Sequence, residues 1–327
     1  MYVRCARMMT QYSISSSVPL VSVHCMAYNH EKYIRNALDG FVMQEAPFPF
    51  EVIIHDDAST DNTANIIREY ETMYPHIIKP IYQTENQYSK KVSITKNFLL
   101  PKSQGKYIAL CEGDDYWIDK HKLFKQVRYL EKHPECSATF HPVNYIVDGK
   151  INNNDKYWNE EIDITTGDAI IRGGYFIATC SIVYRKEIAL LELPFLDMPG
   201  VGDYKLQVLL AANGKVHYLP DIMGCYRYLS SGSYSVKFNE DREFRAKIWM
   251  DSIKWLIQFN KDTDYKHQFP VSVKIYSVLQ SLNQEQALPE NSYMYKVYSE
   301  THNKMQMAQA KILEPLTLKL SKGMNND

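Results

Sequence analysis

The stretch Gly105-Lys-Tyr-Ile-Ala-Leu-Cys-Glu112-Gly-Asp-Asp115 carries most of the information about the fold, because it joins an apolar segment to a cluster of carboxylates. Residues 106–111 are mostly apolar, which is typical of a strand buried on both faces of a sheet. The acidic residues follow at the end of that strand. Ligands of open α/β sheets bind beyond the carboxyl ends of the strands. The stretch therefore predicts a ligand site at one edge of a buried sheet.

Strand and helix patterns alternate on both sides of this stretch. From their apolar and β-branched side chains we expect strands at residues 19–26, 50–55, 77–82, 106–111 and 136–147. Helical patterns lie between them at residues 31–44, 63–73, 92–103 and 119–132. This alternation predicts an α/β fold whose central, mostly parallel sheet is flanked by helices.

The second half of the chain is less regular. We expect a polar loop at 149–160, a strand over 176–184, a loop at 194–202, a helix over 203–213 and a short strand with a bend over 218–228. Helical patterns follow at 240–259, 270–285 and 303–320. The predicted organisation is a polar lead-in (1–18), one α/β domain (19–240, with halves 19–140 and 141–240) and a C-terminal helical extension (241–327).

Composition and charge exclude several classes of protein. The chain has 327 residues, and 37 Lys and Arg against 38 Asp and Glu give a net charge of -1, so we expect no binding to nucleic acid. The sequence contains no run of about 18 apolar residues, the length needed to span a membrane. No apolar segment follows Arg4 and Arg7, as it would in a signal peptide. The six cysteines lack any CxxC spacing, which favours buried free thiols. We expect a cytoplasmic protein that meets the inner face of the membrane only peripherally; the oligomeric state is not predicted.

The acidic cluster itself points to a metal ion. Glu112, Asp114 and Asp115 repel one another at one strand end unless a cation or a polar partner neutralises them. Mn²⁺ and Mg²⁺ take oxygen ligands and often keep substrate phosphates as co-ligands. The cluster therefore predicts a metal–diphosphate site, and its alternative is a solvated acidic turn.

A second acidic pair, Asp56-Asp57, follows the strand at 50–55. Turn and helix-capping chemistry explains the nearby Asp61, because Asp is a usual capping residue. It explains a second consecutive carboxylate less well. A carboxylate at a strand end can accept the N3–H of a uracil ring or a ribose hydroxyl, which is the other interpretation of Asp57.

The order of these motifs resembles a known family. Val21-Ser-Val-His-Cys-Met-Ala-Tyr28-Asn29, then Val52-Ile-Ile-His-Asp-Asp-Ala-Ser-Thr-Asp61, then the acidic stretch at 105–115 are similar to the nucleotide-binding half of family 2 glycosyltransferases. The similarity covers about residues 19–140. It implies a GT-A fold, an inverting transfer from a nucleotide-sugar, and a nucleotide-binding half (19–140) followed by an acceptor half (141–240).

The resemblance assigns roles on the nucleotide side. Tyr28 is similar to the residue that stacks on the nucleobase, and Asp57 to the carboxylate that binds the base. Lys96 and Asn97 lie in a segment that faces the nucleotide in the family. A pyrimidine nucleotide, as in a UDP-sugar, is the expected donor.

The same resemblance places the acidic residues. Glu112 is similar to the first acidic residue of the family's DXD motif, which contacts ribose or metal. Asp114 is similar to its metal ligand, with Asp115 beside it. Glu112 departs from the commoner Asp, and its longer side chain can still accept a hydroxyl. The implied cofactor is Mn²⁺ or Mg²⁺.

In the acceptor half, Gly202-Asp203 resembles the family's Glu-Asp segment, which holds the catalytic base. Gly202 stands in the Glu place, and Asp203 in the Asp place. The resemblance implies that Asp203 is the general base, which must reach the acceptor proton. A helix N-cap is the alternative role for Asp203.

Three further residues of this half follow from the resemblance. Arg227, in Tyr226-Arg-Tyr228, is similar to an arginine near the phosphates, although the histidine that often follows it is missing. A structural arginine paired with a carboxylate is the alternative. Thr179 and Ser181 fall in the segment that lies on the acceptor side.

Together these features predict an inverting glycosyltransferase with a glycan or lipid-linked acceptor, acting in surface polysaccharide synthesis. Two alternatives stay open. One is a sugar-phosphate nucleotidyltransferase, which usually has a Gly-rich basic N-terminal loop, unlike Tyr28-Asn-His-Glu-Lys32. The other is a non-catalytic module that binds nucleotide-sugars, which the Gly202 departure leaves possible.

Overall fold

The structure is a computed structural model that describes residues 18–152, 158–174, 176–228, 234–288, 292, 294–296 and 298–303. The chain forms two compact units. The first, the α/β unit, comprises Met1–Leu196 and Val201–Val236, and the second, the C-terminal unit, comprises Asp197–Gly200 and Lys237–Asp327.

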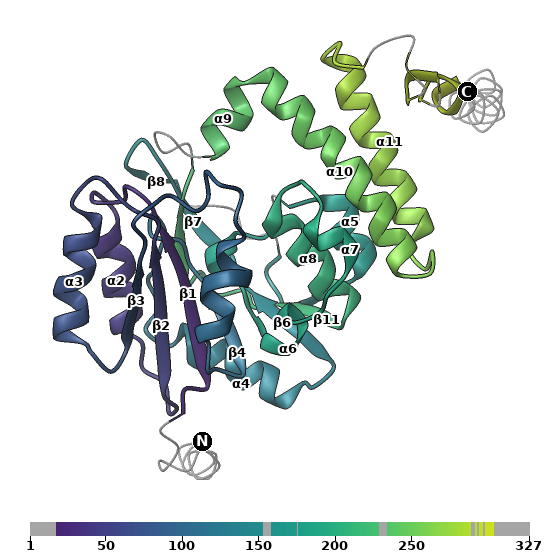
Figure 1. Cartoon of the computed structure of the whole chain (residues 1–327). Coiled ribbons are helices and arrows are strands. Elements are labelled where there is room, and N and C mark those ends of the chain that lie inside the picture. The colour runs from purple at the N-terminus through teal and green to yellow at the C-terminus, as the bar shows by residue number, and fades with distance from the viewer. Residues whose placement is uncertain are drawn as a thin grey trace, which may run out of the picture. The chain divides into compact units, whose positions relative to one another are not determined.

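A mixed eight-stranded sheet forms the centre of the α/β unit, in the order β3-β2-β1-β4-β10-β6-β11-β9 (Figure 1). β1 pairs in parallel with β2 and β4, whereas β10 is antiparallel to both of its neighbours. The expected α/β fold with a mostly parallel sheet is confirmed. The strands are β1 (Val21–Ala27), β2 (Phe50–Asp56), β3 (Ile78–Tyr82), β4 (Tyr107–Leu110), β6 (Cys136–Phe140), β9 (Ile162–Ile164), β10 (Val183–Arg185) and β11 (Lys215–Tyr218).

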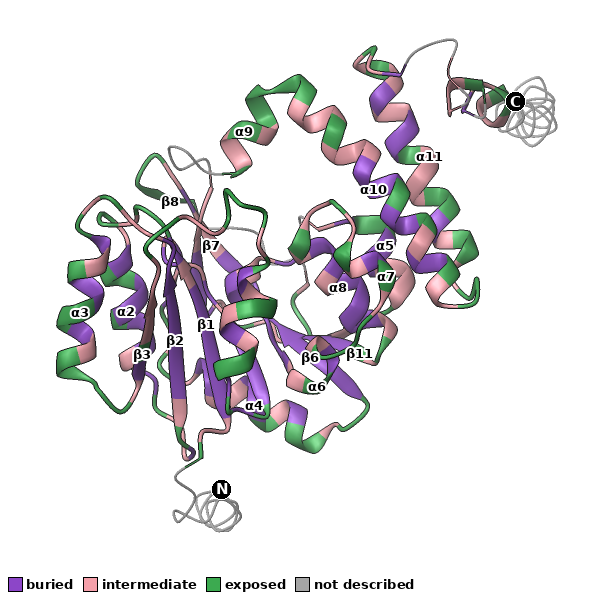
Figure 2. Ribbon diagram, in the orientation of Figure 1, coloured by how far each residue is buried: buried purple, intermediate pink, exposed green. Residues whose placement is uncertain are grey.

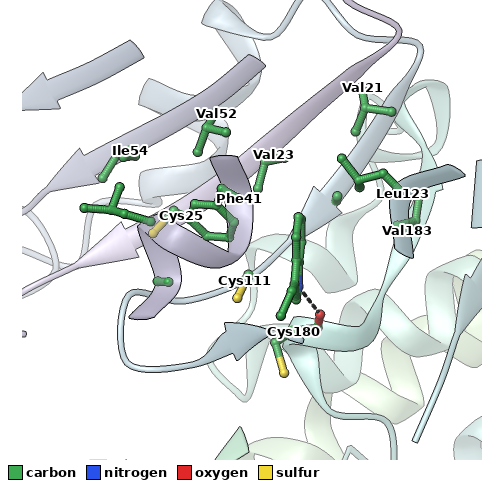
Figure 3. Close-up of a cluster of buried hydrophobic side chains, with 14 of the residues drawn as sticks. Val21, Val23, Cys25, Phe41, Val52, Ile54, Cys111, Leu123, Cys180 and Val183 are labelled. Carbon is green, nitrogen blue, oxygen red and sulfur yellow. Dashed lines mark hydrogen bonds between the residues drawn. The ribbon is translucent and has the colours of Figure 1, made fainter. Parts of the chain in front are cut away.

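Three helices cover one face of this sheet: α2 (Ile34–Val42), α3 (Thr63–Met73) and α4 (Lys122–Lys132). They pack on the alternate residues of β1 and β2 that point to that side, so the strands are buried throughout (Figure 2). Figure 3 shows Phe41 of α2 and Leu123 of α4 in this core with Cys25 of β1.

A short helical segment contributes to the opposite face. It runs as a π-helical turn at Thr95–Leu99 and a 3₁₀ turn at Leu100–Lys102, where we expected a helix over 92–103. Leu99 packs there against Ile53 of β2. The parallel strands β1, β2 and β4 consequently end at one common edge between covered faces, and the motifs identified in the sequence follow at that edge.

A second, four-stranded sheet was not predicted. Its order is β5-β12-β7-β8, and its strands are β5 (Tyr116–Trp117), β7 (Val143–Val147), β8 (Lys150–Asn152) and β12 (Gly224–Arg227). The single strand expected at 136–147 is wrong, because His141-Pro142 separates β6 from β7 in different sheets and Pro142 has no N–H to donate. β8 lies in the expected loop at 149–160, so that prediction is also wrong at its start.

The remaining elements of the acceptor half are short. The strand expected over 176–184 is a 3₁₀ turn at Thr179–Ser181 followed by β10, and the loop expected at 194–202 begins with α7 (Pro194–Asp197). α8 (Gly202–Ala212) is the helix expected over 203–213. The others are α5 (Thr166–Arg172), α6 (Lys186–Ala189) and α9 (Tyr234–Glu240).

The C-terminal unit is a helical hairpin of α10 (Arg242–Asp262) and α11 (Gln268–Gln284), close to the helices expected at 240–259 and 270–285. Ile253 of α10 packs with Leu279 and Leu282 of α11. The helix expected over 303–320 lies, apart from residue 303, outside the described residues, as does the lead-in at 1–17. Within the described part of the chain, no helix has the length and apolar character needed to cross a bilayer.

The cysteines agree with the expectation of buried free thiols. All five cysteines in the described residues are free and buried, and Cys5 lies outside those residues. They are Cys25, Cys111, Cys136, Cys180 and Cys225.

Candidate active site

The acidic turn, residues 111–115, begins where β4 ends and stays attached to β1. The N–H groups of Cys111 and Gly113 donate to carbonyls of β1 at 3.1 and 2.9 Å, so the turn extends the β1–β4 ladder. Gly113 is required by close packing, since a Cβ there would lie 2.8 Å from His30 Nδ1. Backbone bonds and packing therefore fix the positions of the carboxylates.

The three carboxylates of this turn form one cluster. Single oxygens of Glu112, Asp114 and Asp115 lie within 4.8 Å of one another. Burial, with the negative charges of Asp114 and Asp203, raises the pKa of Glu112 to about 8. Burial, with the same cluster's charges, raises the pKa of Asp115 well above its usual range. The cluster is thus crowded with negative charge, which a cation would relieve.

Asp115 offers a further sign that the turn fits a metal ion. Its Oδ1 accepts a hydrogen bond from the Arg227 N–H at 2.8 Å. Its Oδ2 is buried and, among the described residues, has no hydrogen-bond donor in ordinary geometry, although the Cys180 thiol lies beside it. Buried carboxylate oxygens are normally satisfied. Three oxygen donors with one buried oxygen to spare suit Mn²⁺ or Mg²⁺.

Arg227 of β12 reaches the acidic turn from the second sheet. Its guanidinium donates to Asp114 O at 2.5 Å and to Asn36 Oδ1 of α2 at 3.0 Å. It also lies over the rings of Tyr33, at 4.7 Å, and Tyr116, at 5.0 Å. The structure therefore brings Arg227 to the acidic turn, which it braces, and a contact with the donor diphosphate stays a prediction.

Asp203 lies in the first turn of α8, one residue inside the helix, and the N-cap is Val201 instead. The Tyr204 N–H donates to Asp203 Oδ1 at 2.8 Å, and the Thr179 hydroxyl is hydrogen-bonded to the same carboxylate. Burial raises the pKa of Asp203, and these hydrogen bonds oppose the rise. Its charge acts on Glu112. Asp203 therefore lies near enough to the acidic turn for its charge to act on Glu112, although the two are far apart in the sequence.

The nucleotide-side residues lie at the ends of β1 and β2. Tyr28 is 44% exposed, which leaves a ring face open to a base. Asp57 is buried, and its two carboxylate oxygens accept the N–H groups of Gln87 (2.7 Å) and Tyr88 (3.0 Å). Asp57 thus holds the turn at 87–88 beside the end of β2, and its contact with a nucleobase stays a prediction.

The family described as Glycosyl transferase family 2 matches residues 22–190, which is more than half of the chain. The chain belongs to glycosyltransferase family 2. The family match covers the acidic turn and the ends of β1 and β2. It ends before Asp203 and Arg227, so only the structure relates these two residues to the acidic turn.

Two relatives differ in how much is known of them. The chain is 40% identical over 229 residues to "Uncharacterized protein Rv1520" of Mycobacterium tuberculosis (strain ATCC 25618 / H37Rv), covering 68% of this chain and only 63% of that protein. It is 26% identical over 225 residues to "UDP-Glc:alpha-D-GlcNAc-diphosphoundecaprenol beta-1,3-glucosyltransferase WfaP" of Escherichia coli, covering 68% and 82%.

Solved structures agree with the GT-A-like fold of the family. S. aureus TarS 1-349 in complex with UDP-GlcNAc superimposes with a TM-score of 0.56 at 19% identity, over 83% of this chain and 82% of that one. Mannosyltransferase PcManGT from Pyrobaculum calidifontis, in complex with GDP-Man and Mn²⁺, gives 0.53 at 15% identity, over 94% and 87%.

Three other predicted residues are not joined to the acidic turn in this way. Lys96 and Asn97 are exposed on the Thr95–Leu99 turn, where Asn97 Nδ2 donates to Ser93 O at 2.8 Å. Their contact with a nucleotide stays a prediction. Ser181 is fully buried, and its hydroxyl donates to Ala178 O at 2.6 Å. Its contact with an acceptor stays a prediction.

Sequence reasoning missed the residues that support the site from other elements. Asn36 and Tyr33 come from the start of α2 and hold the Arg227 guanidinium, 191 residues away from Asn36 in the chain. The turn at 87–88 holds Asp57 through backbone N–H groups, which no side-chain motif reveals. A single sequence carries no signal for such distant partners.

Proposed function

We propose that this chain is an inverting glycosyltransferase, which moves a sugar from a nucleotide-sugar, preferably a UDP-sugar, to a hydroxyl of a glycan or lipid-linked acceptor. Surface polysaccharide synthesis is the process it would serve. One observation carries the proposal: Asp203 lies within electrostatic reach of Glu112, in a turn of three carboxylates at the carboxyl end of β4.

Glu112, Asp114 and Asp115 would hold Mn²⁺ or Mg²⁺, and the ion, when bound, supplies Lewis-acid charge to the leaving diphosphate. Arg227 keeps the turn in place through Asp114 O and through Asp115 Oδ1. Glu112 and Asp115, whose raised pKa values favour their protonated forms, would have to lose their protons to act as metal ligands, so the affinity for the ion would rise with pH.

Asp203 is the general base of the proposed reaction. It takes the proton of the acceptor hydroxyl while that oxygen forms a bond to the anomeric carbon. The bond between the anomeric carbon and the diphosphate oxygen breaks at the same time, and the nucleoside diphosphate leaves with its electron pair. Attack from the face opposite the leaving group inverts the stereochemistry. Burial raises the pKa of Asp203, which strengthens it as a base.

The donor base is assigned to the edge formed by β1 and β2. The exposed Tyr28 offers a ring face for stacking, and the buried Asp57 orders the adjacent backbone. A similar structure contains UDP-GlcNAc, and another contains GDP-Man. Because the two similar structures contain different nucleotides, the proposed preference for UDP rests on the residue types at Tyr28 and Asp57 and not on these structures. The lipid-linked acceptor rests on the name of the E. coli relative.

Calorimetry of UDP and GDP binding, with Mn²⁺ or with EDTA, tests the donor side. We expect UDP to bind more tightly than GDP, and only in the presence of Mn²⁺. Equal affinity in EDTA would remove the metal from the proposal, and tighter binding of GDP would reverse the base preference. Asp114→Asn should greatly weaken the effect of Mn²⁺, because it replaces a charged carboxylate of the cluster by a neutral amide.

Release of UDP from UDP-sugars, with and without glycan or lipid-linked acceptors, tests the reaction itself. We expect acceptor-dependent release and an inverted linkage in the product, which NMR of the anomeric proton reports. Donor binding without any transfer or hydrolysis would instead favour a non-catalytic module. Pyrophosphate formed from a nucleoside triphosphate and a sugar phosphate would indicate a nucleotidyltransferase.

A further inference from the structure

The end of the α10–α11 hairpin carries apolar side chains in water. Ile257, Tyr265, Phe269 and Val273 are 55%, 59%, 76% and 38% exposed. From Lys237 onwards these are the only exposed large apolar residues in the described part of the chain, and all four fall between residues 257 and 273. Clustered exposure of this kind marks a surface that binds something.

The tip of the hairpin is ordered, so this exposure is built into the fold. The Tyr265 N–H donates to Asn260 O at 2.7 Å, and the Phe259 ring stacks on His267 with centroids 5.4 Å apart. Tyr265 has a φ of 58°, a left-handed conformation that costs energy for an aromatic residue. Backbone strain that the surrounding bonds maintain is a sign of a functional position.

Lysines accompany the apolar residues. Lys254 and Lys261 are exposed on α10 at spacings that put them on one helical face with Ile257, and Lys266 is exposed at the tip. Lys254 contacts Asp251 at 3.2 Å, and the side chain of Asp251 is nearly buried.

Acidic residues are scarce on the same surface. The sequence of α11 contains no Asp or Glu at all, and Lys274 is its one charged residue. Asp264 is the exposed acid of the tip, and the neighbouring Asp262 is partly buried and accepts a hydrogen bond from Gln258 at 2.7 Å. The hairpin end is therefore apolar and net positive.

We propose that this surface, formed by Ile257, Tyr265, Phe269 and Val273 with Lys254, Lys261 and Lys266, docks on an anionic lipid bilayer. Aromatic and aliphatic side chains on a basic helical element bury themselves at the boundary of headgroups and acyl chains. Lysines extend their charge to the headgroups while their stems lie on the apolar layer. Both features are present together at this end, and the docking requires no helix that spans the membrane.

A second copy of the chain is a poorer occupant for the same surface. In a two-fold dimer the surface would face itself, which would bring its lysines close to their own copies. Like charges facing each other across an interface oppose association. An anionic bilayer satisfies the apolar and the basic residues at once.

Co-sedimentation of the full chain with vesicles tests the proposal. We expect binding to vesicles of phosphatidylcholine mixed with phosphatidylglycerol, and far weaker binding to phosphatidylcholine alone. Phe269→Ser should lower the partition coefficient by about tenfold, since it removes a large apolar side chain from the bilayer. Lys261→Gln and Lys266→Gln should each lower it about fivefold on anionic vesicles only, and high salt should do the same.

Met73→Ser is the matched control, because Met73 is 55% exposed on α3 of the α/β unit. It should leave vesicle binding unchanged. Equal binding by Phe269→Ser and Met73→Ser, or no binding by the unmodified chain, would overturn the proposal. So would a concentration-dependent dimer that Phe269→Ser dissociates, in the absence of vesicle binding. Vesicle binding needs no donor or acceptor, so this test is independent of the glycosyltransferase assignment.

Discussion

The nucleotide half and the acceptor half hold their carboxylates by different means. In the nucleotide half, Asp57 and the acidic turn at 111–115 follow neighbouring parallel strands. Two backbone N–H groups donate to the Asp57 carboxylate, and two N–H groups of the acidic turn donate to carbonyls of β1. In the acceptor half, Asp203 lies in the first turn of α8 and is held by the backbone N–H groups of Tyr204 and of Asp203 itself and by the Thr179 hydroxyl. The donor side is thus built by a repeating architecture, and the acceptor side by local contacts of short elements.

This difference has a functional consequence. A rigid strand edge suits a ligand whose diphosphate and metal geometry is constant, whereas short turns and helices can change to suit different acceptors. The family match follows the same division, since it ends at residue 190, before Asp203. This division of roles would be wrong if the acceptor half contributed only packing and no catalytic residue. The Asp203→Asn variant, for which we expect the largest effect, tests this.

Asp203→Asn should reduce transfer by about 10²–10⁴-fold, the usual contribution of a general base. Donor affinity should stay nearly unchanged, because the acidic turn is intact. Stability should fall by no more than about 1 kcal/mol, the scale of a change at a helix start. Rates of transfer, calorimetry of UDP with Mn²⁺ and thermal melting check the three statements.

The pH profile adds a second test of the same residue. Because burial raises the pKa of Asp203, the rate should fall on the acid side at a higher pH than an ordinary carboxylate would give. Asp221→Asn, a change at an exposed carboxylate of the same half, is the control and should transfer normally. Full activity in folded Asp203→Asn would contradict the assignment and move the search to Glu192 or Asp197.

Much of the nucleotide half could be predicted from the sequence. β1, β2 and β4 consist mostly of apolar residues, because helices and turns bury both faces of the sheet, and such strands can be recognised without knowing their partners. The helix at 63–73 was predicted with its observed bounds, since its apolar residues repeat at helical spacing. The acidic turn was predictable because three carboxylates at a strand end have few structural uses.

The second sheet escaped prediction for physical reasons. β5, β8 and β12 have two to four residues each, too short for a periodic pattern. Asp148-Gly149, both with positive φ, make the β7–β8 hairpin, and an Asp-Gly pair between strand-like residues is typical of such a two-residue turn. The site role of Arg227 rests on the β5–β12 pairing, a long-range contact that local sequence does not encode.

Arg227→Met should weaken the Mn²⁺-dependent binding of UDP by about 10–100-fold, the usual cost of removing a residue that orients metal ligands. The second sheet would then be shown to support the nucleotide half. Arg227→Lys should restore little of this binding. The guanidinium donates to Asp114 O and to Asn36 Oδ1 from two different nitrogens, whereas all N–H groups of an ammonium share one nitrogen. Arg128→Met, at an exposed arginine of α4, should bind as the unmodified chain does. Normal binding by Arg227→Met would restrict the site to the nucleotide half.

Lys122→Met probes how the nucleotide half tolerates a charge in its core. Lys122 is fully buried, donates to Gln126 Oε1 at 2.7 Å and lies 4.1 Å from the centre of the Trp117 ring. Burial lowers its pKa to about 7. The unfolded chain then binds more protons than the folded one above that pH, so the lysine's destabilising contribution shrinks as pH rises.

The expected result is a stability difference that depends on pH. Relative to the unmodified chain, the advantage of Lys122→Met should shrink by about 2 kcal/mol between pH 7 and 9. Urea unfolding at both pH values measures it. Lys132→Met, at an exposed lysine of the same helix, should show no such change. A parallel pH dependence of the two variants would mean that Lys122 keeps an ordinary pKa in the folded state.

Gly202→Glu is expected to have the smallest effect on stability. It tests whether the acceptor half can accommodate a carboxylate at the position where the family has Glu. A Cβ at Gly202 would meet nothing within 4 Å, and the residue is the first of α8. Replacing a helical glycine restricts the unfolded chain, and a negative charge suits a helix start, so stability should rise by about 0.5–1 kcal/mol. Gly202→Gln separates the two terms, since it lacks the charge. If the Glu variant is less stable than the Gln variant, the negative charges of Asp203 and the acidic turn repel a carboxylate at residue 202. If Asp203 alone is the base, transfer should be the same in both variants, whereas faster transfer in Gly202→Glu only would assign part of the family's base function to that position.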